Sequence, residues 1–155
     1  MIILKRTTSD DKDFSSLITR LDLDLQSRYG STQDEFDQYN VIENLHTVVI
    51  VYEDHEPLGC GCFKKFSDDT VELKRMYVTN EQRGKGIGAL VLTELEKWIV
   101  ELDYNMIVLE TGTKQPEAIQ LYKKQGYRII PNYAPYTGND LSICMKKQLL
   151  RIKLK

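Results

Sequence analysis

The first third of the chain alternates apolar and polar residues in a way that predicts a strand followed by helices. Residues 2–5 are apolar enough for a short strand. Asp10 or Asp11 can cap a helix, because the apolar residues that follow recur at helical spacing. These residues are Phe14, Leu17, Ile18, Leu21 and Leu25. A Gly-Ser-Thr segment at 30–32 then interrupts the pattern, and a second helix is expected over 33–40.

The centre of the chain favours strands instead. Residues 47–52 are apolar and β-branched, which is typical of a strand. Short polar turns at 54–57 and 67–69 separate this run from two further strand-like runs, at 58–66 and 71–78. Three strands joined by short turns predict a meander.

Helical and strand-like segments then alternate toward the end of the chain. Residues 87–102 place one apolar stripe along a helix, at positions 87, 90, 91, 95, 98, 99 and 102. Residues 106–110 predict a strand, and 115–124 predict a short helix that Gly126 ends. The remaining strands are expected near 127–130 and 141–145.

Three glycines, Gly84, Gly86 and Gly88, fall at the junction between the strand at 71–78 and the start of the following helix. Such a turn exposes successive N–H groups at the positive end of a helix, with no side chains in the way. Arg83 and Lys85 add positive charge that can meet phosphate oxygens. The segment therefore predicts a diphosphate-binding turn, and a plain glycine turn that caps the helix is the alternative.

Two common phosphate-binding patterns do not fit this turn. A P-loop needs a Gly-Lys-Ser/Thr ending after four intervening residues, and no such spacing or hydroxyl is present. A dinucleotide-binding fold places its glycines after the first strand, with an acid about twenty residues later. This turn lies past the middle of the chain, and Glu110 is further away than that.

Three motifs in order resemble the GNAT family of N-acetyltransferases. They are Glu-Leu-x-x-Met-Tyr-Val at 72–78, Arg-x-x-Gly-x-Gly at 83–88, and Ala-Ile-Gln-Leu-Tyr-Lys-Lys-Gln-Gly-Tyr at 118–127. The resemblance implies a single domain over 1–155 with an α/β (α+β) fold. Its central sheet would be mixed, mostly antiparallel, with about seven strands, four flanking helices and a splayed parallel strand pair.

The same resemblance implies that acetyl-CoA is the acyl donor, without a metal. The amides of 83–88 would bind the CoA diphosphate, and main-chain groups of the strand end would bind the pantetheine and polarise the thioester. Gln115, where the family usually has asparagine, keeps an amide for the pantetheine or the neighbouring strand. The implied cofactor-binding set is Met76, Tyr77, Val78, Arg83, Gly84, Lys85, Gly86, Ile87, Gly88, Gln115, Ala118 and Tyr122.

Two residues of the motifs match catalytic positions of the family. Tyr122 would be a general acid for the leaving thiolate, or else a helix tyrosine packed on the sheet. Glu72 would be the general base, because an alkylammonium must lose a proton before it attacks a thioester. A strand glutamate paired with Lys74 or another lysine is the alternative for Glu72.

The segment Pro-Asn-Tyr-Ala-Pro-Tyr at 131–136 looks like a loop found in a subgroup of small bacterial members of the family. In that subgroup it would lie over the acceptor pocket, so Tyr133 and Tyr136 are candidate substrate-binding residues. A rigid hairpin connection is the alternative. Arg75 could hold a substrate carboxylate, or it could be a surface charge.

The composition of the chain limits the classes of binding partner that we expect. The chain has 155 residues and a formal charge of −2, which argues against nucleic acid as the main partner. No apolar run reaches the ~18 residues that a membrane span needs, and no signal peptide is evident, so we expect a cytoplasmic protein. Cys60, Cys62 and Cys144 show no metal-binding spacing, and we expect small buried thiols.

The sequence thus predicts an N-acetyltransferase that moves an acetyl group from acetyl-CoA to a primary amine by direct attack. No cysteine falls within the motifs, which disfavours a covalent acyl-enzyme. A small molecule or amino acid is the favoured acceptor, and a protein N-terminus or lysine is the alternative. A non-catalytic acyl-CoA sensor is the rival from another class. The oligomeric state stays open, and a homodimer is one possibility.

Overall fold

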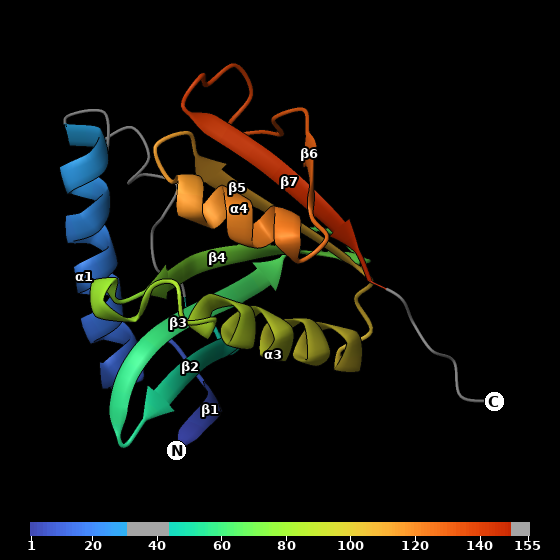
Figure 1. The fold of residues 1–155 in the computed structure, drawn as a ribbon. Coiled ribbons are helices and arrows are strands. Elements are labelled where there is room, and N and C mark those ends of the chain that lie inside the picture. The colour runs from blue at the N-terminus through green and yellow to red at the C-terminus, as the bar shows by residue number, and fades with distance from the viewer. Residues whose placement is uncertain (31–43, 150–155) are drawn as a thin grey trace. The chain divides into compact units, whose positions relative to one another are not determined.

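The computed structural model describes residues 1–30 and 44–149 (Figure 1). Their strands form one seven-stranded mixed sheet in the order β1-β2-β3-β4-β5-β7-β6. The chain divides into two compact units. Unit 1 comprises Met1–Phe63 and Lys74–Leu95, and unit 2 comprises Lys64–Leu73 and Glu96–Lys155. Strand β4 (Thr70–Val78) and helix α3 (Ile87–Glu101) each begin in one unit and end in the other.

Unit 1 contains an antiparallel meander and the first helix. Strands β1 (Ile2–Thr7), β2 (Val48–Glu53) and β3 (Glu56–Lys65) pair in sequence. Helix α1 (Lys12–Tyr29) begins where the sequence predicts, because the Asp11 carboxylate caps it by accepting from the Asp13 N–H. Its apolar side packs into a core formed by Phe14, Leu17, Ile18, Leu21, Val48, Ile50, Cys60, Cys62 and Tyr77.

Alternate residues of strand β3 pack on opposite faces of the sheet. Cys60 and Cys62 point to the α1 side, as their spacing predicts, and are buried in the core with α1. Gly59 and Gly61 alternate with them. A Cβ on Gly59 would lie 2.8 Å from the Tyr77 carbonyl oxygen, and one on Gly61 would collide with Met76. The two glycines therefore permit close packing that any side chain would obstruct.

Unit 2 is built on strand β5 (Met106–Gly112). The first part of β4 pairs with β5 in parallel, from Thr70 opposite Met106 to Glu72 opposite Val108. Strand β7 (Ser142–Gln148) pairs antiparallel with β5 on one side and with β6 (Arg128–Ile130) on the other. The short helix α4 (Pro116–Lys124) follows β5. The parallel pair and the mostly antiparallel sheet confirm the expected fold class.

Three details differ from the sequence predictions. The described residues contain three α-helices, α1, α3 and α4, rather than four, together with a single 3-10 turn, η2 (Asn80–Gln82). The expected helix at 33–40 lies outside the described residues. The predicted stripe on α3 is buried at Ile87, Val91, Leu95 and Ile99, together with Leu92, whereas Leu90 and Leu102, the residue after the helix, are exposed.

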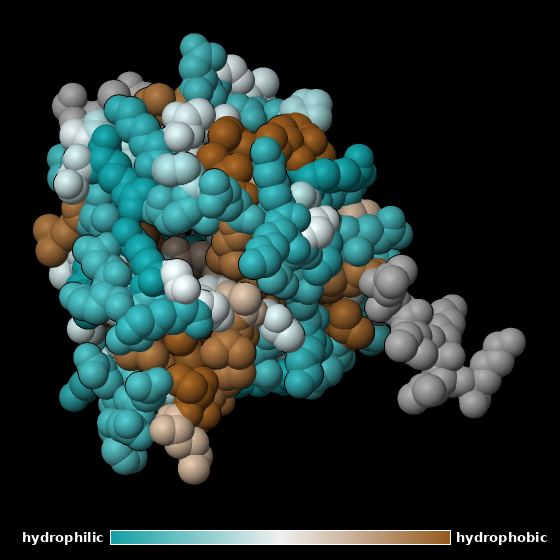
Figure 2. All heavy atoms as spheres, in the orientation of Figure 1, coloured by the Kyte–Doolittle hydropathy of each residue, from teal (hydrophilic) through white to brown (hydrophobic). Residues whose placement is uncertain are grey.

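The surface of helix α1 agrees with its amphipathic sequence. Figure 2 shows hydrophilic residues over most of the outer side of this helix, at the left of the view. Within the ranges 1–30 and 44–149, no helix is long and apolar enough to cross a membrane.

Candidate active site

The glycine turn in unit 1 has open space around its glycines. Gly84 and Gly86 have φ angles of 79° and 80°, which only glycine adopts readily. A Cβ at either position would meet no atom within 4 Å. The turn is reached through η2, where the N–H of Arg83 bonds to the Asn80 carbonyl. The Gly86 carbonyl accepts from the Leu90 N–H, so Gly86 lies directly before α3, which begins at Ile87.

The Arg83 side chain contacts residues of β4 and α1 next to this turn. Its Nε donates to the Val78 carbonyl at 3.3 Å, and its Nη2 lies 3.4 Å from the Asp24 carboxylate of α1. Its guanidinium also lies over the Tyr77 ring, 5.9 Å from the centroid. Lys85 is exposed on the turn. The structure thus gives Arg83 structural partners and leaves the Lys85 ammonium in solvent.

The end of β4 is kinked at Arg75. This residue has a φ of 57°, unusual for a side chain other than glycine. Thiols of Cys60 and Cys62 donate to the carbonyls of Arg75 and Lys74, at 3.5 and 3.2 Å. The Arg75 side chain is only 10% exposed and its guanidinium lies 2.7 Å from Asp22. Arg75 is therefore ion-paired and mostly covered, and its binding to a substrate carboxylate stays a prediction.

In unit 2, Glu72 lies on a buried face of the sheet. The residue is 5% exposed, and its Oε2 accepts a hydrogen bond from the Tyr133 hydroxyl at 2.7 Å. Burial, followed by the charge and hydrogen bond of Glu72, raises the pKa of Tyr133 above its ordinary value. The phenol therefore stays protonated at neutral pH and remains a donor to Glu72. The sequence named both residues but did not bring them together.

A second carboxylate shares this face. Glu110 lies two positions beyond Val108, the residue paired with Glu72, and opposite Cys144 of β7. Directly paired residues point to the same side of a sheet, so Glu72, Glu110 and Cys144 belong to one face. The Ser142 hydroxyl donates to Glu110 Oε2 at 2.8 Å. The sequence analysis missed Glu110 and Ser142, although strand alternation from Val108 to Glu110 was a usable signal.

Cys144 contacts the loop at 131–141 through a hydrogen bond from the Tyr133 backbone. Burial raises the pKa of the Cys144 thiol, a hydrogen bond from the Tyr133 backbone opposes that shift, and the charges of Glu110 and Glu72 reinforce it. A thiol held protonated in this way is a poor nucleophile.

Helix α4 holds Tyr122 in the interior of unit 2. The ring packs edge-on against Tyr127, with centroids 5.7 Å apart. Burial, and then the charge of Glu110, raise the pKa of Tyr122 above its ordinary value. The phenol is thus a permanent hydrogen-bond donor at neutral pH, while complete transfer of its proton to a thiolate is less favourable than for an ordinary tyrosine.

Gln115 caps the start of α4 and bonds to the neighbouring strand. Its Oε1 accepts from the Gly112 N–H at 3.2 Å, and its carbonyl accepts from the N–H groups of Ala118 and Ile119. Of the two contacts that the sequence left open for this amide, the bond to the strand is present. Ala118 lies in the first turn of the helix.

These motifs can now be compared with known proteins. The sequence profile of the acetyltransferase (GNAT) family matches residues 14–127, which is most of the chain. The chain belongs to this family. The GNAT match includes all three motifs that the sequence analysis used.

Individual relatives agree with the family match. The IAA acetyltransferase of Azospirillum brasilense is 34% identical over 93 residues. That alignment covers 59% of this chain and 61% of the relative, so the chain spans about three fifths of that protein.

Solved structures of GNAT proteins share the fold. A proposed acyl-CoA N-acyltransferase from Klebsiella pneumoniae is 29% identical, with a TM-score of 0.80, and the match covers 97% of this chain and 99% of that one. A proposed streptothricin acetyltransferase from Bacillus anthracis was solved in complex with acetyl coenzyme A. It is 19% identical, has a TM-score of 0.60, and covers 72% of this chain and 67% of its own, so it supports the fold alone.

Proposed function

We propose that this GNAT protein transfers an acetyl group from acetyl-CoA to a primary amine by direct attack. The observation that carries the proposal is the buried Glu72 carboxylate, held by Tyr133 on a sheet face of unit 2. A buried carboxylate beside neutral donors is suited to accept a proton from an incoming ammonium. Family membership supports acetyl-CoA as the donor.

The turn in unit 1 is the proposed diphosphate site. It lies at the start of α3, where the helix end favours negative charge, and the exposed Lys85 can add a charged hydrogen bond. The proposed cofactor-binding residues remain those of the sequence analysis. They are Met76, Tyr77, Val78, Arg83, Gly84, Lys85, Gly86, Ile87, Gly88, Gln115, Ala118 and Tyr122.

The proposed reaction moves two protons. Glu72 takes one proton from the ammonium of the acceptor, directly or through water. The free amine then attacks the thioester carbonyl and a C–N bond forms. As the C–S bond breaks, the nitrogen releases its second proton to solvent, which balances the proton that the sulfur gains. A main-chain N–H of the β4 end polarises that carbonyl. Tyr122 donates a hydrogen bond to the departing sulfur, which gains its proton from the phenol or from solvent.

A small amine or amino acid is the proposed acceptor. The loop at 131–141 is anchored against β7 and β5 by backbone bonds from Ser142 to Asn139 and from Thr113 to Leu141. Tyr136 in this loop is 2% exposed. A fixed loop next to Glu72 favours a compact acceptor over a protein chain. The likeness of this loop to a bacterial subgroup, a cytoplasmic location and a homodimer remain proposals.

A thiol-release assay tests the function and its rivals together. The panel should contain simple amines, diamines, amino acids, and peptides with a free N-terminus or a lysine, each with acetyl-CoA. We expect release with at least one small amine and little with peptides. Release only with peptides would favour the protein acetyltransferase. Tight CoA binding by calorimetry without release on any acceptor would favour the non-catalytic sensor.

A further inference from the structure

We propose that Tyr133 is a positioning residue whose hydroxyl sets the orientation of the Glu72 carboxylate for proton acceptance. This inference rests on the proposed function, in which Glu72 is the base. It assigns Tyr133 a task that acts through Glu72 and differs from direct contact with the acceptor. The central observation is the 2.7 Å hydrogen bond from the Tyr133 hydroxyl to Glu72 Oε2, between residues 61 positions apart.

The Tyr133 ring makes edge contacts with two other rings. Phe66 meets it edge-on with centroids 5.2 Å apart, and Tyr136 does the same at 5.7 Å. Interplanar angles of 78° and 82° place these contacts in the favourable T-shaped class. Phe66 follows β3 in the turn before β4, and Tyr136 lies in the same loop as Tyr133. The hydroxyl therefore has little freedom to leave the carboxylate.

The loop that carries Tyr133 is itself fixed by one side chain. The Asn132 amide nitrogen lies within 3.3 Å of three backbone carbonyls, those of Tyr136, Asn139 and Ser142. The Tyr136 N–H also closes a tight turn onto the Tyr133 carbonyl at 2.7 Å. Loops are ordinarily the mobile part of a fold, and this bonding holds the residue next to Tyr133 against the start of β7. The bonds of the loop backbone and the ring contacts together hold the Tyr133 hydroxyl in position to donate to Glu72 Oε2.

The chemical consequence is an oriented proton acceptor. A glutamate side chain has three rotatable bonds, and ordering it at the moment of reaction costs free energy. Tyr133 pre-orders the carboxylate through Oε2, while its own proton stays in place because the phenol remains protonated at neutral pH. The amine proton ends on Glu72 and no proton passes through Tyr133. Positioning of this kind affects the rate and leaves donor binding unchanged.

The Tyr133→Phe variant tests this directly, because phenylalanine keeps both ring contacts and removes only the hydroxyl. With the amine that works best in the panel, we expect kcat to fall by about 10-fold, the size of one hydrogen bond to a charged group. The KM for acetyl-CoA should not change. Thr137→Val, which removes an exposed hydroxyl from the same loop, serves as the matched control and should retain wild-type turnover.

A double-mutant cycle with Glu72→Gln separates positioning from a general effect on the loop. If Tyr133 acts through the base, Tyr133→Phe should cost almost nothing further once Glu72 is replaced. Equal fold-losses in both backgrounds, or wild-type turnover in Tyr133→Phe, would overturn the inference. A crystal structure of Tyr133→Phe provides a readout that does not depend on activity. An unmoved Glu72 carboxylate there would also overturn the inference, whereas failure of the proposed function would appear as inactivity of the wild type on every acceptor.

Discussion

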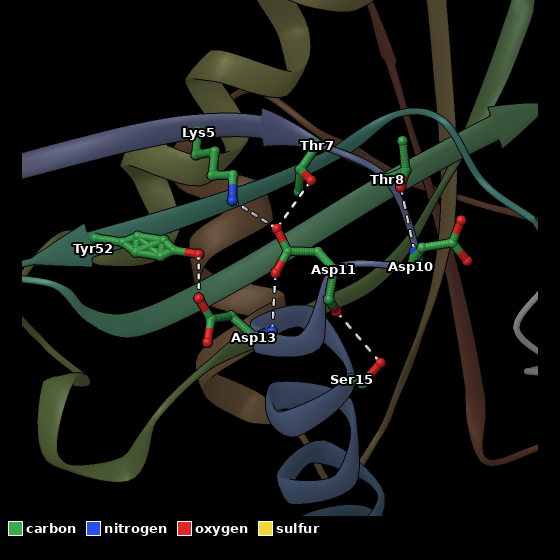
Figure 3. A network of polar contacts seen from close by, with 8 residues as sticks. All are labelled: Lys5, Thr7, Thr8, Asp10, Asp11, Asp13, Ser15 and Tyr52. Atoms are coloured by element: carbon green, nitrogen blue, oxygen red, sulfur yellow. Dashed lines mark hydrogen bonds and ion pairs between the residues drawn. The ribbon is translucent and has the colours of Figure 1, made fainter.

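Two tyrosine–carboxylate contacts of equal length occur in the two units, and their surroundings differ. In unit 1 the Tyr52 hydroxyl donates to Asp13 at 2.7 Å (Figure 3). In unit 2 the Tyr133 hydroxyl donates to Glu72 at the same distance. Asp13 lies in the first turn of α1, where the helix end stabilises its charge. Glu72 lies on a buried sheet face that it shares with another carboxylate, Glu110. The bond length alone therefore does not identify a catalytic acid or base.

The groups next to Asp13 differ from those next to Glu72. Around Asp13, the Asp11 carboxylate caps the helix and pairs with the Lys5 ammonium at 2.9 Å (Figure 3). These contacts lower the pKa of Asp11, which keeps that carboxylate charged, and they tie the helix to β1. Glu72 accepts from the Tyr133 hydroxyl and shares its sheet face with Glu110 and Cys144. In the proposed mechanism, unit 1 would use its acids for folding and its backbone amides for binding, whereas unit 2 would supply the proton transfers.

The largest expected effect comes from the amides of unit 1. Gly86→Asp would place a carboxylate where the diphosphate is proposed to bind, and acetyl-CoA affinity should fall by roughly 10²-fold or more. Calorimetric titration measures this. Gly86→Asn is the matched control, because asparagine tolerates a positive φ about as well as aspartate and carries no charge. Unchanged affinity in a folded Gly86→Asp protein would remove the turn from the binding site.

A smaller effect is expected from Tyr122 in unit 2. Tyr122→Phe should lower kcat by roughly 10²-fold or less, because its raised pKa favours a hydrogen-bonding role over complete proton donation. Acetyl-CoA affinity should stay near the wild-type value. Tyr104→Phe, in the turn after α3, controls for loss of a hydroxyl in the same unit. Wild-type kcat in Tyr122→Phe would show that water alone protonates the thiolate.

The smallest effect concerns stability in unit 1. Burial alone would raise the pKa of Asp11, but hydrogen bonds from Lys5, the Asp13 N–H and Thr7 lower it below the ordinary value. This stabilisation is present above the ordinary pKa and is lost as the pH falls through the folded-state pKa. Asp11→Ala should therefore cost about 1 kcal/mol in urea unfolding at neutral pH, and less in acid. Turnover per folded molecule should be unchanged, and a large loss of turnover would contradict the division between the units.

The sequence predicts the elements well and the contacts between distant residues poorly. Apolar spacing located α1, the meander and β5, because periodicity is a local property of the chain. The Glu72–Tyr133 bond joins residues from different motifs, and its formation depends on the path of the loop after β6. The sequence did not identify Glu110 as a site residue, because its place beside Glu72 depends on the register of β5 with β4 and β7. Likewise, the pairing of Arg75 with Asp22 depends on the kink in β4, which no local pattern signals.

The most direct test of the central claim is the pH–rate profile of Glu72→Gln beside that of Asp13→Asn, with acetyl-CoA affinity measured for both. Both variants replace a carboxylate that accepts from a tyrosine hydroxyl. We predict that Glu72→Gln loses turnover by roughly 10²-fold or more where the acceptor amine is mostly protonated, and less at high pH, where free amine is abundant. Its acetyl-CoA affinity should persist, and Asp13→Asn should follow the wild-type profile. Equal profiles for the two variants, or a loss in Glu72→Gln that is uniform at every pH, would contradict the assignment of Glu72 as the base.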